Sequence, residues 1–116
     1  LSVPDDQLET VMRMYHEGLA VAGLEYVIFG HIGNNHVHVN ILPRSMEEYE
    51  KGKALYLDWA KQVVAMGGSV SAEHGIGKIK TGFLEIMCGT EGIHEMRRLR
   101  EQFDPAGMLN PGNLFP

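Results

Sequence analysis

Three of the six histidines in this chain, His31, His36 and His38, lie within eight residues of one another. Alternate side chains of an extended strand point to opposite faces, so His36, His38 and Asn40 would share one face while valines occupy the other. The spacing predicts a strand that buries its valines and presents imidazoles and an amide. Imidazoles grouped in this way can bind a metal ion or accept a proton near neutral pH.

The preceding residues 26–29 also predict a strand, and a tight turn at Asn34-Asn35 would join the two strands into a hairpin. In that register His31 lies directly opposite His38. Opposed residues have β-carbons about 4.5 to 5.5 Å apart. Two imidazoles at that separation can each bind the same ion at roughly 2.0 to 2.1 Å. The hairpin therefore predicts a site for a divalent metal.

Such a site needs a third protein ligand, and Glu73 is the best candidate because it stands in a glycine-containing loop beside His74. Two imidazoles and one carboxylate that leave a position open are typical of catalytic metal sites. His74 would then be available to take a proton from a bound hydroxyl. The alternative is that all four residues are ordinary polar groups on a solvated face.

Two lysines follow the same loop. Lys78 and Lys80 could bind an anionic group such as a carboxylate or a phosphate, or they could simply be exposed. The sequence Gly75-Ile76-Gly77 is too short to be a phosphate-binding fingerprint, which needs a strand before it and a helix after it in a defined unit.

Composition argues against several classes of protein. The 10 basic and 15 acidic residues give a formal charge of -5 without a basic cluster, so nucleic acid is not an expected partner. The single cysteine, Cys88, cannot form an internal disulfide, and we expect it to be a small buried apolar residue. No apolar run reads as a leader or a membrane span. We expect a soluble cytoplasmic protein, with a partner as its route to any membrane.

The remaining pattern predicts helices around this hairpin. Asp5 or Asp6 would cap a helix that ends at Gly23, and a capping box that begins at Ser45 would start a helix over residues 46–66.

A short helix over residues 80–87 would precede another that Thr90 caps and Asp104-Pro105 ends. With 116 residues, 44% of them hydrophobic, the chain suits one domain without an internal boundary. The predicted class is α+β, an antiparallel sheet with a central hairpin and helices packed on it.

Three motifs together resemble a known family. They are Gly30-His31-x-Gly33 followed by His38-x-Asn40, then residues 71–77, and then Asp104-Pro105 leading to residues 109–112. In this order they are similar to the C-terminal domain of FAD-linked oxidases. That group includes D-lactate dehydrogenase, the glycolate oxidase flavin subunit and D-2-hydroxyglutarate dehydrogenase. The resemblance covers most of residues 1–116.

The resemblance implies specific roles for the residues singled out above. It implies that a divalent metal, most often zinc, is bound by His31, His38 and Glu73. His74 would remove the substrate hydroxyl proton, and a hydride would pass from the α-carbon of a 2-hydroxy acid to FAD, leaving a 2-oxo acid.

It further implies that Asn40 contacts the substrate. We also expect Lys78 to contact the substrate and Asn110 to contact the cofactor. The electron acceptor would be a quinone, an electron-transfer flavoprotein or an iron-sulfur subunit. An N-terminal FAD-binding domain of the same parent protein would hold most of the flavin, so we expect this chain alone to lack flavin and turnover.

The chain departs from the family at the turn. The family usually has Asp-Gly-Asn where this chain has Asn34-Asn35-His36, so the turn can differ and His36 can compete as a ligand.

Two other classes of function stay open. Residues 36–44 resemble the strand motif of histidine-triad nucleotide hydrolases, in which His38 would be the nucleophile. That reading lacks the third histidine, which is Asn40 here, and leaves the loop at Glu73 and the tail at Asn110 unexplained. A non-catalytic domain that docks other subunits is the third class.

Overall fold

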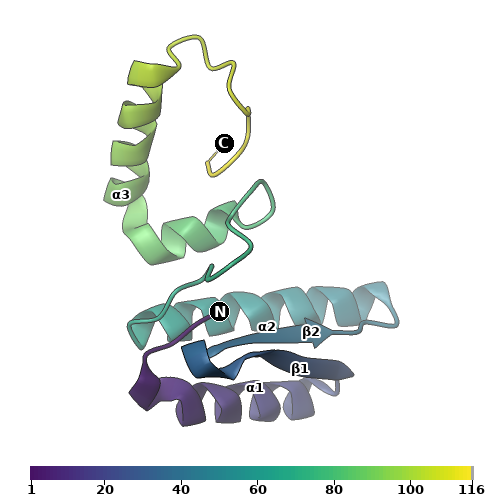
Figure 1. Ribbon diagram of the computed structural model, residues 1–116. Coiled ribbons are helices and arrows are strands. Elements are labelled where there is room, and N and C mark those ends of the chain that lie inside the picture. The colour runs from purple at the N-terminus through teal and green to yellow at the C-terminus, as the bar shows by residue number, and fades with distance from the viewer. Residues whose placement is uncertain (116) are drawn as a thin grey trace. The chain divides into compact units, whose positions relative to one another are not determined.

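Figure 1 shows the computed structural model of the chain, which describes residues 1–115. By their internal contacts the residues group into two compact units, Leu1–Ala72 and Glu73–Pro116, with Pro116 itself outside the described residues. The first unit holds a β-hairpin and two helices, and the second holds a long kinked helix and the tail. The fold is thus α+β, as the sequence predicts.

Helix α1, Leu8–Ala22, ends where the sequence predicts but begins differently. Gly23 closes it in the left-handed conformation, with φ of 65°. A short 3-10 helix, Asp5–Gln7, precedes α1, and no side chain caps the first turn of α1. The predicted capping role of Asp5 or Asp6 is therefore wrong, because this extra turn moves both carboxylates one turn away from the helix start.

The hairpin consists of β1, Tyr26–His31, and β2, His36–Ile41. Its connection is longer than the predicted turn, since a 3-10 helix, Ile32–Asn34, is followed by Asn35 in the left-handed conformation with φ of 50°. The register therefore pairs His31 with His36, and the predicted pairing of His31 with His38 is wrong. The slip is two residues, and because side chains alternate with a period of two, each keeps its predicted face.

Helix α2, Met46–Ala65, begins at the predicted capping box. The backbone N–H of Glu48 donates to the hydroxyl oxygen of Ser45 over 3.2 Å. Helices α1 and α2 lie beside the hairpin (Figure 1) and meet at an edge-to-face contact between Tyr15 and Trp59, whose ring centroids are 4.7 Å apart. The largest fully buried side chains of this unit are Val11, Tyr15, Leu19, Trp59, Val63 and Val70.

The first residues of the chain tie the hairpin to the segment after α2. Ser2 forms β-bridges with both His36 and Ser69. The backbone N–H of Ser2 donates to the carbonyl of Ser69 over 3.0 Å, and the reciprocal bond measures 2.9 Å. Ser2 therefore links the backbone of Ser69 to that of His36.

In the second unit, α3 spans Thr81–Phe103 and is interrupted by Gly89, whose φ of 68° and ψ of 171° are not helical. The sequence predicts two helices with a break before Thr90, and the kink at Gly89 confirms that break. Leu84, Ile93 and Phe115 form the small core of this unit. Cys88 is only half-buried against that core, less than predicted. No helix in the described part of the chain has the length and apolar character needed to cross a membrane.

Candidate active site

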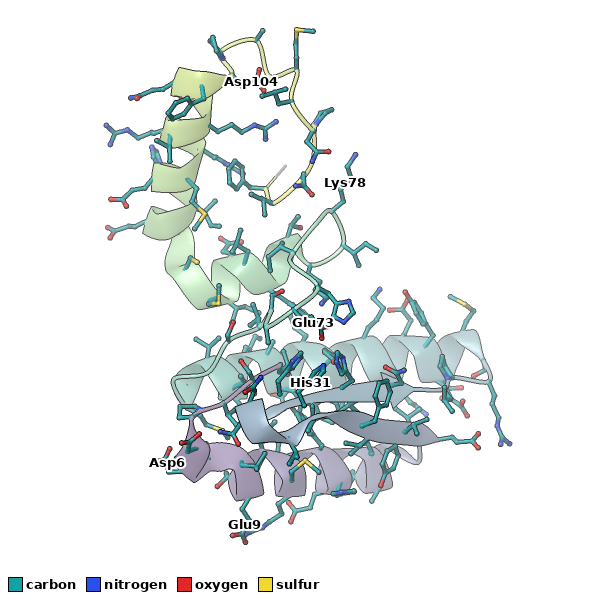
Figure 2. The ribbon with its side chains drawn as sticks, viewed as in Figure 1. Asp6, Glu9, His31, Glu73, Lys78 and Asp104 are labelled. Carbon is teal, nitrogen blue, oxygen red and sulfur yellow. The ribbon has the colours of Figure 1, made fainter. Side chains whose placement is uncertain are left out.

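The outer face of the hairpin carries the polar residues that the sequence singled out. On β2 the side chains of His36, His38 and Asn40 lie on this face, and His31 reaches it from the end of β1 (Figure 2). His36 is buried, with 8% of its surface exposed, whereas His38 is half-buried and His31 and Asn40 are exposed. The inner face buries Val37 and Val39, so the predicted alternation is confirmed.

The structure brings His31 and His38 together diagonally across the hairpin. Their ring centroids are 6.0 Å apart, with an interplanar angle of 68°. A ring centroid lies about 3 Å from an ion that one of its nitrogens binds, so two rings on one ion lie about 5 to 6 Å apart. The spacing and the nitrogen donors therefore fit a shared metal ion.

The third imidazole, that of His36, packs beside the other two. Its ring centroid is 4.6 Å from that of His38 and 5.8 Å from that of His31. Its burial and its contact with both rings suit it to support them.

The His38 ring rests against two residues of β1. Phe29 stacks on it, with centroids 5.2 Å apart and an interplanar angle of 24°. Gly30 lies beneath, and a β-carbon there would come within 3.1 Å of Cδ2 of His38 and 2.8 Å of the carbonyl oxygen of His36. With φ of 141°, Gly30 also adopts a conformation that only glycine enters readily.

Glu73 and His74 lie together in the loop that begins the second unit. Oε2 of Glu73 is 3.7 Å from Nε2 of His74, and both side chains are at least half exposed. Lys78, four residues after His74 in the chain, is exposed (Figure 2). The loop therefore offers a carboxylate, an imidazole and an ammonium group to solvent.

The tail motif lies beside this loop within the second unit. The backbone N–H of Leu114 donates to the carbonyl of Gly77 over 3.0 Å. Asn110 adopts the left-handed conformation, with φ of 50°, and its carbonyl accepts a bond from the N–H of Asn113 over 3.2 Å. The second and third sequence motifs are thus neighbours.

Asp104 holds the start of this tail. Its carboxylate accepts hydrogen bonds from the backbone N–H groups of Met108 and Leu109, over 2.9 and 2.8 Å. The N–H groups of Leu109 and Met108 hold the pKa of the Asp104 carboxyl below its usual value. Arg100 donates to the carbonyl of Leu109 over 3.1 Å, so the residue before Asn110 is held through both its backbone groups.

A hollow of about 400 Å³ opens beside Asn110. Its lining includes Leu99, Phe103, Leu109, Asn110, Asn113 and Phe115. The guanidinium of Arg100 lies 5.7 Å from the ring centroid of Phe115. Sequence reasoning did not anticipate the hollow, because its wall joins the end of α3 to a tail without periodicity.

The residue pattern does not predict the part that Phe29 plays in the site. It predicts Phe29 only as a strand residue, because the exposure of its ring depends on which face of the hairpin the helices cover. Gly30 belongs to the first of the three motifs, but its close approach to His38 depends on the strand pairing. A signal was available, because Phe29 stands two residues before His31 and so shares its face.

Comparison with known proteins decides the family. The model of the FAD linked oxidases, C-terminal domain, matches residues 1–114. The chain belongs to this family. The match covers the loop at Glu73 and the tail at Asn110, which the histidine-triad alternative leaves unexplained.

Curated relatives agree with this assignment. Over 95 residues, 78% of this chain, it is 41% identical to a D-2-hydroxyglutarate dehydrogenase of Stutzerimonas stutzeri. It is 34% identical over 97% of its length to a D-lactate dehydrogenase of Archaeoglobus fulgidus, and 28% identical over 98% to the glycolate oxidase subunit GlcD of Bacillus subtilis. The chain spans 20%, 25% and 25% of these three proteins, respectively.

Proposed function

We propose that this chain is the metal-binding and substrate-binding part of an FAD-dependent dehydrogenase that oxidises small 2-hydroxy acids. The relatives named for D-lactate, glycolate and D-2-hydroxyglutarate support this class of substrate. The single observation that carries the proposal is the pair of imidazoles, His31 and His38, on one face of the hairpin at a spacing suited to one ion.

Glu73 is the third ligand in this proposal. In this proposal it joins His31 and His38, and each of the three residues offers one ligand atom. Two nitrogens and one carboxylate suit zinc and also admit manganese or iron. Glu73 follows Ser69 by four residues, and because Ser69 is bonded to Ser2 beside His36, the covalent chain keeps Glu73 within about 14 Å of that anchor. The chemistry that the ion supplies when bound is a lower pKa of the substrate hydroxyl.

His74 acts as the general base. Its imidazole accepts the proton of the substrate hydroxyl, for which its exposure and its place beside Glu73 are suitable. Lys78 binds the substrate carboxylate through its ammonium group, and the amide of Asn40 orients the same substrate from the hairpin. The chemistry that FAD supplies when bound is acceptance of the hydride from the α-carbon, which leaves a 2-oxo acid.

We assign FAD mainly to another part of the parent protein, the longer protein that would contain this chain. Asn110 is the cofactor contact that this chain would contribute. The hollow beside Asn110, about 400 Å³, is at the small end of ligand pockets and suits one ring system better than a whole dinucleotide. By itself, the chain is therefore expected to bind no flavin and to have no turnover.

The decisive experiment replaces the base in the parent protein. We expect His74→Ala to lower kcat for a 2-hydroxy acid by about 10²- to 10⁴-fold while the flavin absorbance and metal content stay unchanged. His94→Ala, which removes an exposed imidazole from α3, is the matched control and should retain full activity. Equal kcat values for the two variants would contradict the assignment of His74.

The electron acceptor belongs to one of three classes, a quinone, an electron-transfer flavoprotein or an iron-sulfur subunit. We propose a cytoplasmic location, with contact to a membrane made through that partner. Mixing the substrate-reduced parent protein with each acceptor and following flavin reoxidation identifies the class.

A further inference from the structure

Two apolar residues of β1, Val27 and Phe29, lie beside the polar residues His38 and Asn40 on the outer face of the hairpin. Phe29 pairs with His38, and Val27 pairs with Asn40. Directly opposed residues of an antiparallel pair lie on the same face, with β-carbons about 4.5 to 5.5 Å apart. The row formed by Val27 and Phe29 therefore lies one strand away from the row formed by His38 and Asn40.

Both apolar side chains remain accessible. Phe29 is 54% exposed and Val27 is 48% exposed, although one side of the Phe29 ring stacks on His38. A single exposed apolar residue on a protein surface is ordinary. Here two of them are aligned, and each lies opposite a residue to which the proposed function gives a role.

The spacing along the strand matches a small substrate. His38 and Asn40 are two residues apart, which is about 6.6 to 6.8 Å along an extended strand. A 2-hydroxy acid with its hydroxyl at the His38 end and a polar atom at Asn40 would lie lengthwise on β2. Its carbon substituent would then lie over the neighbouring strand.

We propose that Val27 and Phe29 form the subsite for the substituent on the α-carbon, and that they select 2-hydroxy acids with an apolar substituent over those with a second carboxylate. This inference rests on the proposed function and deepens it. A second carboxylate bound here would lose water without gaining a cationic partner from Val27 or Phe29, and this desolvation is costly.

Charge around the hairpin supports this selectivity. The outward residues of the two strands are Val27, Phe29, His31, His36, His38 and Asn40, which include no lysine or arginine. Arg44, just beyond the end of β2, already donates to the Glu25 carboxylate over 2.7 and 3.0 Å. The hairpin itself thus supplies an apolar surface for the substituent.

The test compares two substrates in the parent protein loaded with FAD and metal. The ratio of kcat/KM for D-2-hydroxybutyrate to that for D-2-hydroxyglutarate should exceed one in the unmodified protein. Phe29→Arg should lower this ratio at least about tenfold, because the guanidinium offers a partner to the second carboxylate. Phe29→Leu should keep the ratio above one. Val21→Arg, which adds the same charge at a 91% exposed position of α1, should leave it unchanged.

A second measurement does not depend on turnover. Equilibrium titration with 2-oxobutyrate and 2-oxoglutarate, the corresponding products, should show that Phe29→Arg lowers the preference for 2-oxobutyrate by a similar factor and that Val21→Arg does not. An unchanged preference in Phe29→Arg, with metal and flavin content intact, would overturn the subsite and leave the proposed function standing. Absence of activity of the unmodified protein on any 2-hydroxy acid would overturn both.

Discussion

The carbonyl oxygen of His36 lies 2.8 Å from the position that a β-carbon on Gly30 would occupy. This approach leaves no room for a side chain between the strands, and φ of 141° at Gly30 strains any other residue there. We expect Gly30→Ala to lower the free energy of unfolding by about 1 to 3 kcal/mol. It should also weaken metal binding, because the His38 ring would be displaced from its seat.

Gly33→Ala is the matched control, since a β-carbon at Gly33 meets nothing within 4 Å. Urea denaturation followed by circular dichroism, together with zinc titration, measures both effects. If Gly30→Ala and Gly33→Ala behaved alike in both measurements, the close approach at Gly30 would have no energetic importance.

Removing a proposed ligand should cost more metal affinity than removing a group that supports one. Loss of a supporting group typically lowers affinity by about 10- to 100-fold. We expect His36→Ala, which removes the buried ring packed on His38, to fall in that range. His31→Ala and His38→Ala should each lower the zinc affinity by more than that range. Zinc titration of the parent protein gives the order, with His94→Ala as the control. If His36→Ala bound zinc more weakly than His38→Ala, His36 would itself be a ligand.

Asp104 should make the tail sensitive to acid. Its pKa is lowered from 3.8 by the N–H groups of Leu109 and Met108, so the folded state favours the carboxylate. The stabilisation is present above pH 3.8 and is lost as pH falls below that value toward the lowered pKa. Amide hydrogen exchange at Met108 and Leu109 should therefore be faster in Asp104→Ala than in the unmodified protein at pH 5.

Glu101→Gln, at an exposed position on α3, should leave that exchange unchanged. When the unmodified protein is exposed briefly to pH 2.5 and then returned to pH 5, it should recover slow exchange at the Met108 and Leu109 amides. Equal exchange at pH 5 in Asp104→Ala and the unmodified protein would show that the two hydrogen bonds do not order the tail.

Local chemistry explains why most elements could be predicted. The capping box at Ser45, the terminating Gly23 and the break before Thr90 each depend on a few consecutive residues. The faces of the hairpin followed from a period of two, which survives a register error of two residues. This is why His31 and His38 were correctly placed on one side although their pairing was wrong.

What could not be predicted depends on longer-range geometry. Asn34-Asn35 is consistent with a two-residue turn, and only the packed structure favours a 3-10 helix followed by Asn35 in the left-handed conformation. The exposure of Phe29 depends on which face of the hairpin α1 and α2 cover. The hollow beside Asn110 depends on the return of the tail to Gly77.

The sheet has two strands, and within residues 1–115 only one side of β1 is paired. Its sequence from Tyr26 to His31 contains no lysine, proline or acidic residue, the usual means by which edge strands discourage unwanted pairing. The outer peptide groups of β1 are thus a ready template for a strand from another molecule. A preparation of this chain alone is therefore exposed to edge-to-edge aggregation, and a covering strand or a solubilising fusion partner at that edge would protect it.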